Sequence, residues 1–173
     1  MRKYKKLLDP LTYLFASSTP QHWADLGCGT GVFTEALAGY LPENSLITAI
    51  DLTHQQLDDR MGNNVSVDFC QANFVSEDLP TSNLDGILFA NALHFVKDKE
   101  ALIRKLEKQF KSTPTFLIVE YDHTQPNQWE PYPLPFAELD KMFNKLGYKK
   151  IERTGEKKSV YGGMMYACLI SKN

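Results

Sequence analysis

From residue 20 onward, short apolar runs alternate with stretches whose apolar residues recur every three or four positions. Short apolar runs are typical of buried strands, and the wider spacing is typical of helices. This pattern predicts five strands, at His22–Asp25, 45–51, Val65–Gln71, Leu84–Ala90 and Thr115–Glu120. Helices are predicted at Val32–Ala38, Glu100–Glu107 and Phe136–Leu146. Such alternation indicates a layered α/β fold with a mostly parallel sheet.

The end of the chain has a different pattern. Strands are predicted at Tyr148–Thr154 and Ser159–Ser171, joined by a turn at Gly155–Lys158. Because this turn is too short for a parallel crossover, the two strands are expected to form an antiparallel hairpin. The predicted fold class is therefore α/β, with a three-layer, doubly wound, mostly parallel sheet of seven strands that ends in an antiparallel hairpin.

Length and composition indicate one soluble domain over residues 1–173. A chain of this length buries roughly 70% of its unfolded surface, and it contains no repeat or linker. A net charge of −2 does not favour nucleic acid as a partner. The basic start with Leu7–Leu8 is interrupted by Asp9–Pro10 before it reaches the length of a secretion signal, and no apolar run approaches a membrane span. We therefore expect a cytoplasmic protein, either a monomer or a homodimer.

The cysteines and histidines indicate neither disulfides nor a metal site. Cys28, Cys70 and Cys168 are odd in number, far apart and without C-x-x-C spacing. The four histidines are scattered as well, so no metal is expected. The cysteines are interpreted as reduced side chains.

The segment Asp25-Leu26-Gly27-Cys28-Gly29-Thr30-Gly31, between the first strand and the first helix, is the most informative part of the sequence. Alternate glycines allow a sharp turn and let a ligand lie against bare main chain, near the N–H groups that begin the helix. Asp25 would repel a phosphate, but it suits a ligand that carries an ammonium group.

This spacing differs from the dinucleotide fingerprint, because the third glycine comes one residue early and Val32 stands where glycine or alanine is expected. The pattern D-x-G-x-G-x-G instead resembles motif I of the class I S-adenosylmethionine (SAM) dependent methyltransferases. That resemblance covers nearly all of the chain after residue 20, and the terminal hairpin agrees with it. It implies SAM as the cofactor, with its amino-acid end held by Asp25, Gly27, Cys28, Gly29 and Gly31.

Asp51 ends the second predicted strand, twenty residues after the glycine segment. A carboxylate at this place is expected to accept hydrogen bonds from the two hydroxyls of a ribose. The alternative is that Asp51 only caps a helix that begins at Thr53. Leu52 is expected to form an apolar wall of the adenine site.

Asn73 and Phe74 follow the third strand. In the resembling family this junction flanks the adenine ring, which implies that Asn73 accepts from the adenine amino group and that Phe74 packs on the ring. The alternative is a turn asparagine and a core phenylalanine.

The fourth strand ends in Asn91-Ala92-Leu93-His94-Phe95. The resemblance places this segment, with Asn91, beside the methionine part of SAM. It lacks the N-P-P-Y motif of DNA adenine and protein glutamine methyltransferases, and it resembles small-molecule enzymes of the quinone-biosynthesis-like type. His94 is the candidate general base, because histidine changes charge near neutral pH. The alternative is that it only hydrogen-bonds local backbone.

The acceptor site is expected beyond the fifth strand. Tyr121 is a candidate catalytic residue there, and a proline-rich loop follows with Trp129 and Tyr132 as candidate walls. Residues 1–19 are expected to form a helical lid or docking segment that adds Tyr4 and Tyr13. The alternative for the proline-rich loop is a plain surface loop whose Trp129 covers the core. The alternative for residues 1–19 is a docked structural helix or a dimer contact.

The expected function is transfer of a methyl group from SAM, by direct in-line displacement, to a small apolar or aromatic acceptor. Two alternatives stay open: a SAM methyltransferase that acts on RNA or protein, and a non-catalytic SAM-binding protein. An NAD-dependent reductase is disfavoured by Val32 and by the terminal hairpin.

Overall fold

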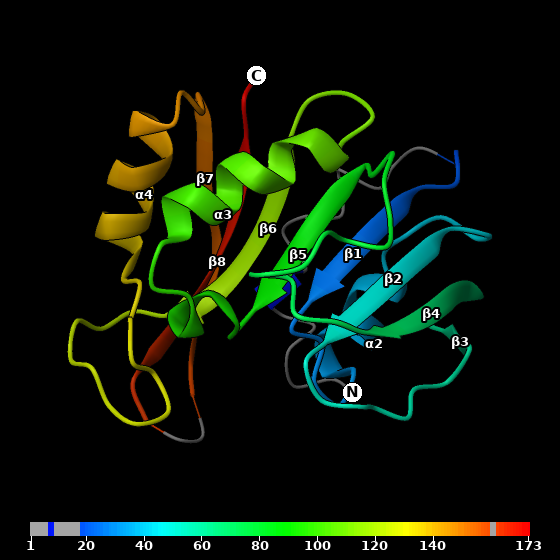
Figure 1. Cartoon of the computed structure of the whole chain (residues 1–173), viewed down its shortest axis with the longest axis horizontal. Coiled ribbons are helices and arrows are strands. Elements are labelled where there is room, and N and C mark those ends of the chain that lie inside the picture. Colours follow the sequence, from blue (N-terminus) through cyan, green and yellow to red (C-terminus); the bar gives the residue numbers. More distant parts are fainter. Residues whose placement is uncertain (1–6, 9–17, 160–161) are drawn as a thin grey trace.

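An eight-stranded sheet runs through the part of the chain that is described in this computed structural model, residues 7–8, 18–159 and 162–173. The order of its strands is β3-β4-β2-β1-β5-β6-β8-β7 (Figure 1). The strands are β1 (His22–Leu26), β2 (Leu46–Asp51), β3 (Arg60–Met61), β4 (Val65–Gln71), β5 (Gly86–Ala90), β6 (Thr115–Tyr121), β7 (Lys150–Lys158) and β8 (Met164–Ser171).

Five neighbouring strands, β4, β2, β1, β5 and β6, are parallel, and β8 and β7 complete the sheet in antiparallel orientation. The predicted fold class is therefore confirmed, with one strand more than expected. The additional strand, β3, has two residues and pairs antiparallel with β4. It escaped prediction because two residues form no recognisable alternation.

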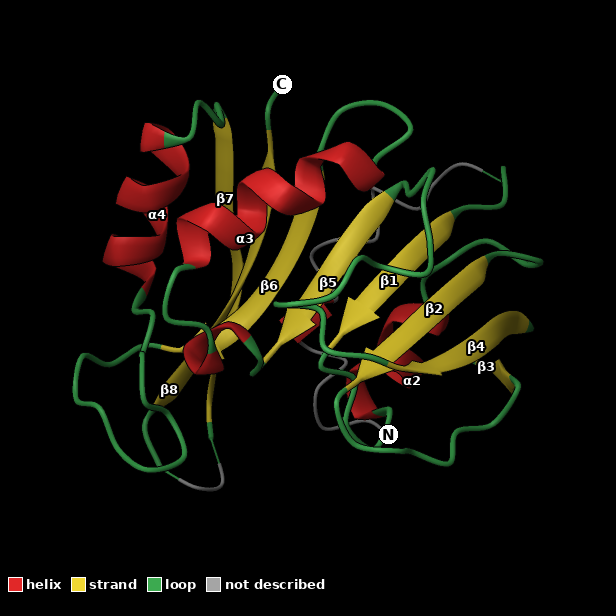
Figure 2. Cartoon of the chain, viewed as in Figure 1, coloured by secondary structure: helices red, strands yellow, loops and turns green. Residues whose placement is uncertain are grey.

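Helices lie on both faces of the sheet, which gives the three expected layers (Figures 1 and 2). The helix α2 (Val32–Ala38) packs on one face, and α3 (Lys99–Leu106) and α4 (Phe136–Lys145) pack on the other. Two short 3₁₀ helices, η2 (Leu93–Phe95) and η3 (Glu107–Gln109), complete the described elements. None of the helices in the described ranges is long and apolar enough to cross a membrane.

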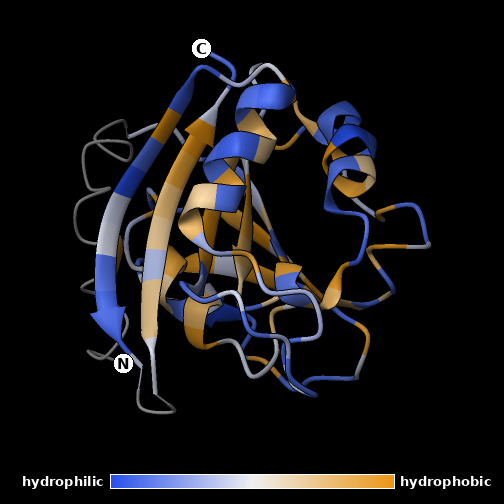
Figure 3. Ribbon diagram, turned by 90° about the vertical axis from the view of Figure 1, so that its left-hand side faces the viewer, coloured by the Kyte–Doolittle hydropathy of each residue, from blue (hydrophilic) through white to orange (hydrophobic). Residues whose placement is uncertain are grey.

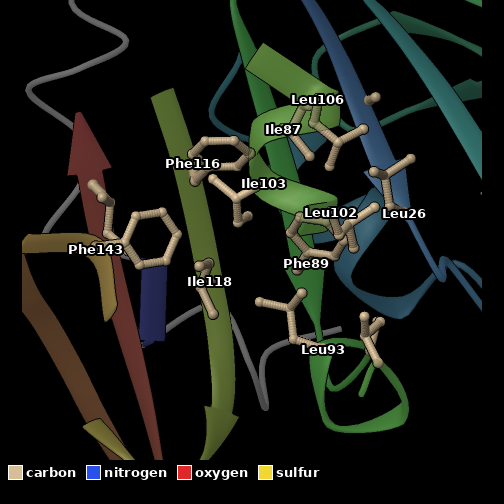
Figure 4. Packing of buried hydrophobic residues seen from close by; sticks show 14 of the residues in the cluster. Leu26, Ile87, Phe89, Leu93, Leu102, Ile103, Leu106, Phe116, Ile118 and Phe143 are labelled. Atoms are coloured by element: carbon tan, nitrogen blue, oxygen red, sulfur yellow. The ribbon is translucent and has the colours of Figure 1, made fainter. Parts of the chain in front are cut away.

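The central strands are apolar on both faces and therefore supply two hydrophobic cores. In β5, Ile87 and Phe89 face α3, whereas Leu88 and Ala90 belong to the core beneath α2. Figure 4 shows the first core, in which Phe89 and Phe116 stack with ring centroids 6.4 Å apart. Burial of both faces explains why the strand sequences are continuous apolar runs.

The predicted turn at Gly155–Lys158 is wrong, because these residues belong to β7. The connection between β7 and β8 lies after Lys158 instead. A Cβ at position 155 would lie 2.8 Å from the carbonyl oxygen of Leu7, which is itself buried. The absence of a side chain at Gly155 therefore lets β7 lie close to the backbone of Leu7. The residues around Gly155 do not indicate which distant segment it contacts.

The strand β7 forms one edge of the sheet, and Figure 3 shows it as mostly hydrophilic beside the mostly hydrophobic β8. Charged side chains on an edge strand oppose pairing with another chain. The functional candidates lie elsewhere, at the carboxyl ends of the parallel strands.

Candidate functional site

The glycine segment follows β1 and turns into α2 with the expected backbone geometry. Gly27 and Gly29 have φ values of 81° and 50°, in the left-handed region. A Cβ at Gly27 would lie 2.7 Å from the Cβ of Ala92, whereas a Cβ at Gly29 would meet nothing within 4 Å. Gly27 thus packs tightly against the segment after β5, while Gly29 presents bare main chain to open space.

Asp25 lies beneath this loop and is completely buried. Its Oδ2 accepts a hydrogen bond of 2.6 Å from the Thr34 hydroxyl, and its Oδ1 has no partner among the described residues. Burial, with a smaller effect from the charge of Asp51, raises the pKa of Asp25 to about 7. A cation on the loop would stabilise this carboxylate, so the site fits the ammonium group of an amino-acid ligand.

The loop is held to β2 through its backbone. The N–H groups of Gly27 and Cys28 both donate to the carbonyl of Ile50, at 2.8 and 3.1 Å. Burial raises the pKa of the Cys28 thiol far above its usual range, so this side chain stays protonated and is a packing group. It contributes backbone to the loop and no nucleophile.

Asp51 connects the end of β2 to the glycine segment. Its Oδ2 accepts from the Gly29 N–H and its Oδ1 from the Thr53 N–H, both at 2.9 Å. Residues 52–59 contain no helix, so the alternative of a helix cap is wrong. Each carboxylate oxygen keeps a second lone pair for a hydroxyl of a ligand.

A cavity of about 570 Å³ opens beside this loop. We call it the donor cavity, because the sequence predicts that the methyl donor SAM binds at this loop. It brings together six of the predicted cofactor residues, namely Gly27, Asp51, Leu52, Asn73, Phe74 and Asn91. Asp25, Cys28, Gly29 and Gly31 belong to the loop beside it and are not among its lining residues. A pocket of this size suits a nucleoside-sized ligand.

Asn73 lies on the donor cavity in a different role from the expected one. Its Oδ1 accepts from the N–H groups of Val75 and Ser76, at 3.0 and 3.3 Å. The oxygen therefore closes a turn, as asparagine often does after a strand, and the amide nitrogen is the part available to a ligand. Phe74 both lines the cavity and packs edge-on against Phe89 in the core, with centroids 5.8 Å apart.

A second cavity, of about 620 Å³, adjoins the first. We call it the acceptor cavity, because the sequence predicts that the methyl acceptor binds at this place. Its lining residues are Asn91, His94, Phe95, Tyr121, Asn127, Trp129 and Glu130. Asn91 and Phe95 line both cavities, so ligands in the two would meet at these side chains.

Asn91 occupies this boundary with an unusual backbone. Its φ is 54°, and its N–H donates to the Val119 carbonyl at 2.8 Å. Its Oδ1 is buried and has no partner among the described residues. Left-handed backbone and an unsatisfied buried oxygen are both unfavourable, and such features concentrate at functional sites.

His94 forms a buried pair with Glu120, a residue that sequence reasoning missed. The His94 Nδ1 lies 2.8 Å from the Glu120 Oε2, and the other carboxylate oxygen accepts from the N–H groups of Leu93 and His94, at 2.8 and 3.2 Å. These three contacts favour an ionised Glu120 and a proton on Nδ1, which leaves Nε2 as an acceptor when the ring is neutral. The alternative in which His94 bonds only to local backbone is wrong. The sequence does contain a signal for this role, because Glu120 is an acidic residue at the end of an otherwise apolar strand.

Tyr121 lines the acceptor cavity next to His94. The centroids of the two rings are 6.4 Å apart, and the Ser159 hydroxyl lies 3.4 Å from the phenol oxygen. The predicted catalytic residues are thus brought together, although no described contact joins their polar atoms directly.

The proline-rich loop is fixed by polar contacts as well as by its prolines. The Asn127 Oδ1 accepts from the N–H groups of Trp129 and Glu130, at 2.8 and 3.0 Å, and the His123 Nε2 forms a hydrogen bond with the Glu130 Oε2. Trp129, 72% exposed, lines the cavity as expected.

Tyr132 anchors the loop and is not among the lining residues of the acceptor cavity. Its N–H donates to the His94 carbonyl at 2.9 Å, and its own carbonyl accepts from the Lys99 ammonium at 2.8 Å. Lys99 also donates to the Val96 carbonyl, and burial lowers its pKa. Tyr4 and Tyr13 lie outside the described residues, and within those residues no cluster of side chains could hold a metal ion.

Comparisons with known proteins agree with this architecture. A family model described as a methyltransferase domain matches residues 21–161. None of the curated protein sequences matches the chain.

Solved structures show the same fold at low sequence identity. A Burkholderia thailandensis 1,6-didemethyltoxoflavin N1-methyltransferase, with its substrate and S-adenosylhomocysteine bound, is 17% identical, with a TM-score of 0.70 over 98% of this chain and 79% of that chain. A Synechocystis magnesium protoporphyrin IX methyltransferase with bound SAM is 15% identical, with a TM-score of 0.69 over 98% and 80% of the two chains. An Aquifex aeolicus SAM-dependent methyltransferase is 16% identical, with a TM-score of 0.64 over 98% and 94%. The chain therefore belongs to the methyltransferase domain family and has the fold of class I SAM-dependent methyltransferases, which confirms the resemblance seen in its sequence.

Proposed function

We propose that this methyltransferase takes its methyl group from SAM and transfers it to a small molecule with an apolar or aromatic body. The observation that carries the proposal is the pair of adjoining cavities that share Asn91 and Phe95. The donor cavity has Asp51 and the glycine segment at its side, and the acceptor cavity has the His94–Glu120 pair.

On the donor side, each predicted group has a physical reason to bind part of SAM. Asp51, already oriented by Gly29 and Thr53, is suited to the ribose hydroxyls. Asp25 stabilises the ammonium group through its charge beneath the loop, and Leu52 and Phe74 flank the adenine. When bound, SAM supplies a methyl group on a positively charged sulfur, and the electrons of the broken carbon–sulfur bond remain on that sulfur.

On the acceptor side, His94 is the proposed general base. Glu120 holds the ring with Nδ1 protonated, so Nε2 takes the proton that the acceptor loses. Glu120 acts through His94 and is a positioning residue. Asn91 orients the acceptor at the boundary between the cavities, and Tyr121 and Trp129 form aromatic walls.

A small acceptor is favoured over RNA or protein by the small-molecule size of the acceptor cavity and by the net charge of −2, which offers no general attraction to nucleic acid. Two of the structural neighbours, named for a didemethyltoxoflavin and for a magnesium porphyrin, act on planar small molecules. The helical lid or docking segment at residues 1–19 with Tyr4 and Tyr13, the cytoplasmic location and the monomeric or dimeric state stay predictions.

Transfer of labelled methyl groups tests this function. The full chain is incubated with methyl-labelled SAM in three separate reactions. One contains a panel of aromatic metabolites, one total RNA and one total protein. We expect labelled product in the small-molecule fraction, and we expect His94→Gln to lose most of the rate while still binding S-adenosylhomocysteine. Label found only in RNA or only in protein would show that the methyl acceptor is a macromolecule and would contradict the proposal of a small-molecule acceptor. Binding without transfer to any fraction would identify a non-catalytic SAM-binding protein.

A further inference from the structure

Three aromatic side chains line the acceptor cavity, and each comes from a different segment. Phe95 belongs to η2, Tyr121 ends β6, and Trp129 lies in the proline-rich loop. Phe95 is 58% exposed and Trp129 72% exposed, although large apolar side chains are normally covered. Aromatic faces grouped around a cavity attract a cation, because the quadrupole of each neutral ring makes its face partially negative.

The same wall contains a carboxylate. Glu130 lines the acceptor cavity, and its side chain is held in place by the hydrogen bond with the His123 ring. A second carboxylate, Glu120, is buried directly behind His94. The described lining residues include no lysine or arginine, and the one histidine among them, His94, is already paired with Glu120, so they offer no free cation to a carboxylate or phosphate on a ligand.

Two cationic side chains near this end of the sheet have other partners. The Lys99 ammonium donates to the carbonyls of Val96 and Tyr132, at 2.8 Å in each case. Arg153 is paired with Asp122 at 3.0 Å. Neither side chain lines the acceptor cavity.

Two polar atoms at the cavity can accept a hydrogen bond from a ligand when the His94 ring is neutral. The Asn91 Oδ1 has no partner among the described residues, and the contact between Nδ1 and Glu120 leaves the His94 Nε2 as an acceptor. A ligand that satisfies these atoms must donate hydrogen bonds, as a protonated nitrogen does.

We propose that the methyl acceptor carries a basic nitrogen and is bound in its protonated form. The positive group lies between the rings of Phe95, Tyr121 and Trp129, with Glu130 as its counter-ion. This inference rests on the proposed function, because it describes the acceptor of the same reaction. It narrows the acceptor to amines and basic heterocycles, and it excludes carboxylates and phosphates.

Three compounds that share an indole ring test the charge preference: tryptamine is a cation, 3-methylindole is neutral, and indole-3-propionate is an anion. Each is titrated by calorimetry into the full chain after saturation with S-adenosylhomocysteine. We expect tryptamine to bind at least about tenfold more tightly than indole-3-propionate. Glu130→Gln should remove most of that difference, whereas Glu43→Gln, a carboxylate outside both cavities, should preserve it.

Trp129→Leu provides a second variant, because this exposed side chain can be changed without disturbing a core. It should reduce the preference for tryptamine over 3-methylindole. The proposal is overturned if the anion binds the wild-type protein as tightly as the cation, or if none of the three compounds binds measurably. The initial titration with S-adenosylhomocysteine tests the proposed function separately, since a protein that does not bind it fails at the donor cavity, not at the acceptor cavity.

Discussion

The buried carboxylate of Asp25 predicts that removing its charge stabilises the protein. Asp25→Asn keeps the shape of the side chain and retains an oxygen that accepts from the Thr34 hydroxyl. Burial raises the pKa of Asp25 from 3.8 to about 7, a difference of about three units. At 1.36 kcal/mol per unit this corresponds to about 4 kcal/mol between the two protonation states.

The pH dependence of this stabilisation follows from the difference between the pKa of Asp25 in the folded and in the unfolded protein. Because the folded-state pKa is raised, the contribution of this group to stability is fully present below about pH 4 and is lost as the pH rises through about 7. Asparagine has no such loss. The new amide nitrogen is itself buried, which costs about 1–3 kcal/mol. We therefore expect Asp25→Asn to be more stable than the wild type by about 2 kcal/mol at pH 8, with most of that gain lost at pH 5.

Urea denaturation of both proteins at pH 5 and pH 8, without ligand, measures this difference. Asp68→Asn, which changes an exposed carboxylate of β4, serves as the control. The same Asp25→Asn variant should bind SAM about tenfold more weakly, since the ammonium group loses its opposing charge. A variant that is less stable than the wild type at pH 8, or whose gain is equal at both pH values, would refute this reasoning.

Three further substitutions test separate parts of the site. Asp51→Ala should weaken SAM binding by about 1.5–3 kcal/mol in a calorimetric titration, because it removes a charged acceptor of hydrogen bonds, and unchanged affinity would exclude it from the ribose site. Trp129→Ala should raise KM for the acceptor and leave the Kd of SAM almost unchanged, whereas the reverse would place the loop at the donor cavity. Glu120→Gln should lower kcat about 100-fold without altering SAM binding, since an amide that donates to Nδ1 leaves the proton of His94 on Nε2. A normal kcat in this variant would rule out the positioning role.

The sheet could be predicted because its central strands β2, β5 and β6 are buried on both faces and read as nearly continuous apolar runs. The two-residue strand β3 was beyond prediction, since a pairing so short depends on its neighbour β4 and not on its own sequence. Gly155 was misassigned for a related reason. Its absent side chain makes room for the backbone of Leu7, which lies far away in the sequence.

The donor side of the site followed from local spacing. Gly27, Gly29 and Asp51 lie where a glycine segment and the end of the next parallel strand must place them. Asn73 was placed correctly beside the cavity, but its oxygen bonds to the turn after it, because an asparagine side chain reaches its own backbone as easily as a ligand.

The acceptor side was harder to predict, because its contacts join residues that are distant in the sequence. The pair of His94 and Glu120 joins η2 to β6, and the position of Glu130 depends on a hydrogen bond with His123. Tyr132 was expected as a wall of the cavity, whereas the structure places its backbone between His94 and Lys99. Sequence identified the loop, but only the packed structure shows which of its residues face the cavity.

The donor cavity is the centre of this account, and calorimetric titration of the full chain with S-adenosylhomocysteine and with NAD tests it most directly. The geometry of Asp25, Gly29 and Asp51 predicts saturable binding of S-adenosylhomocysteine with one ligand per chain, weakened in Asp51→Ala, and no binding of NAD. Saturable binding of NAD with no response to S-adenosylhomocysteine would contradict the assignment of this cavity to SAM.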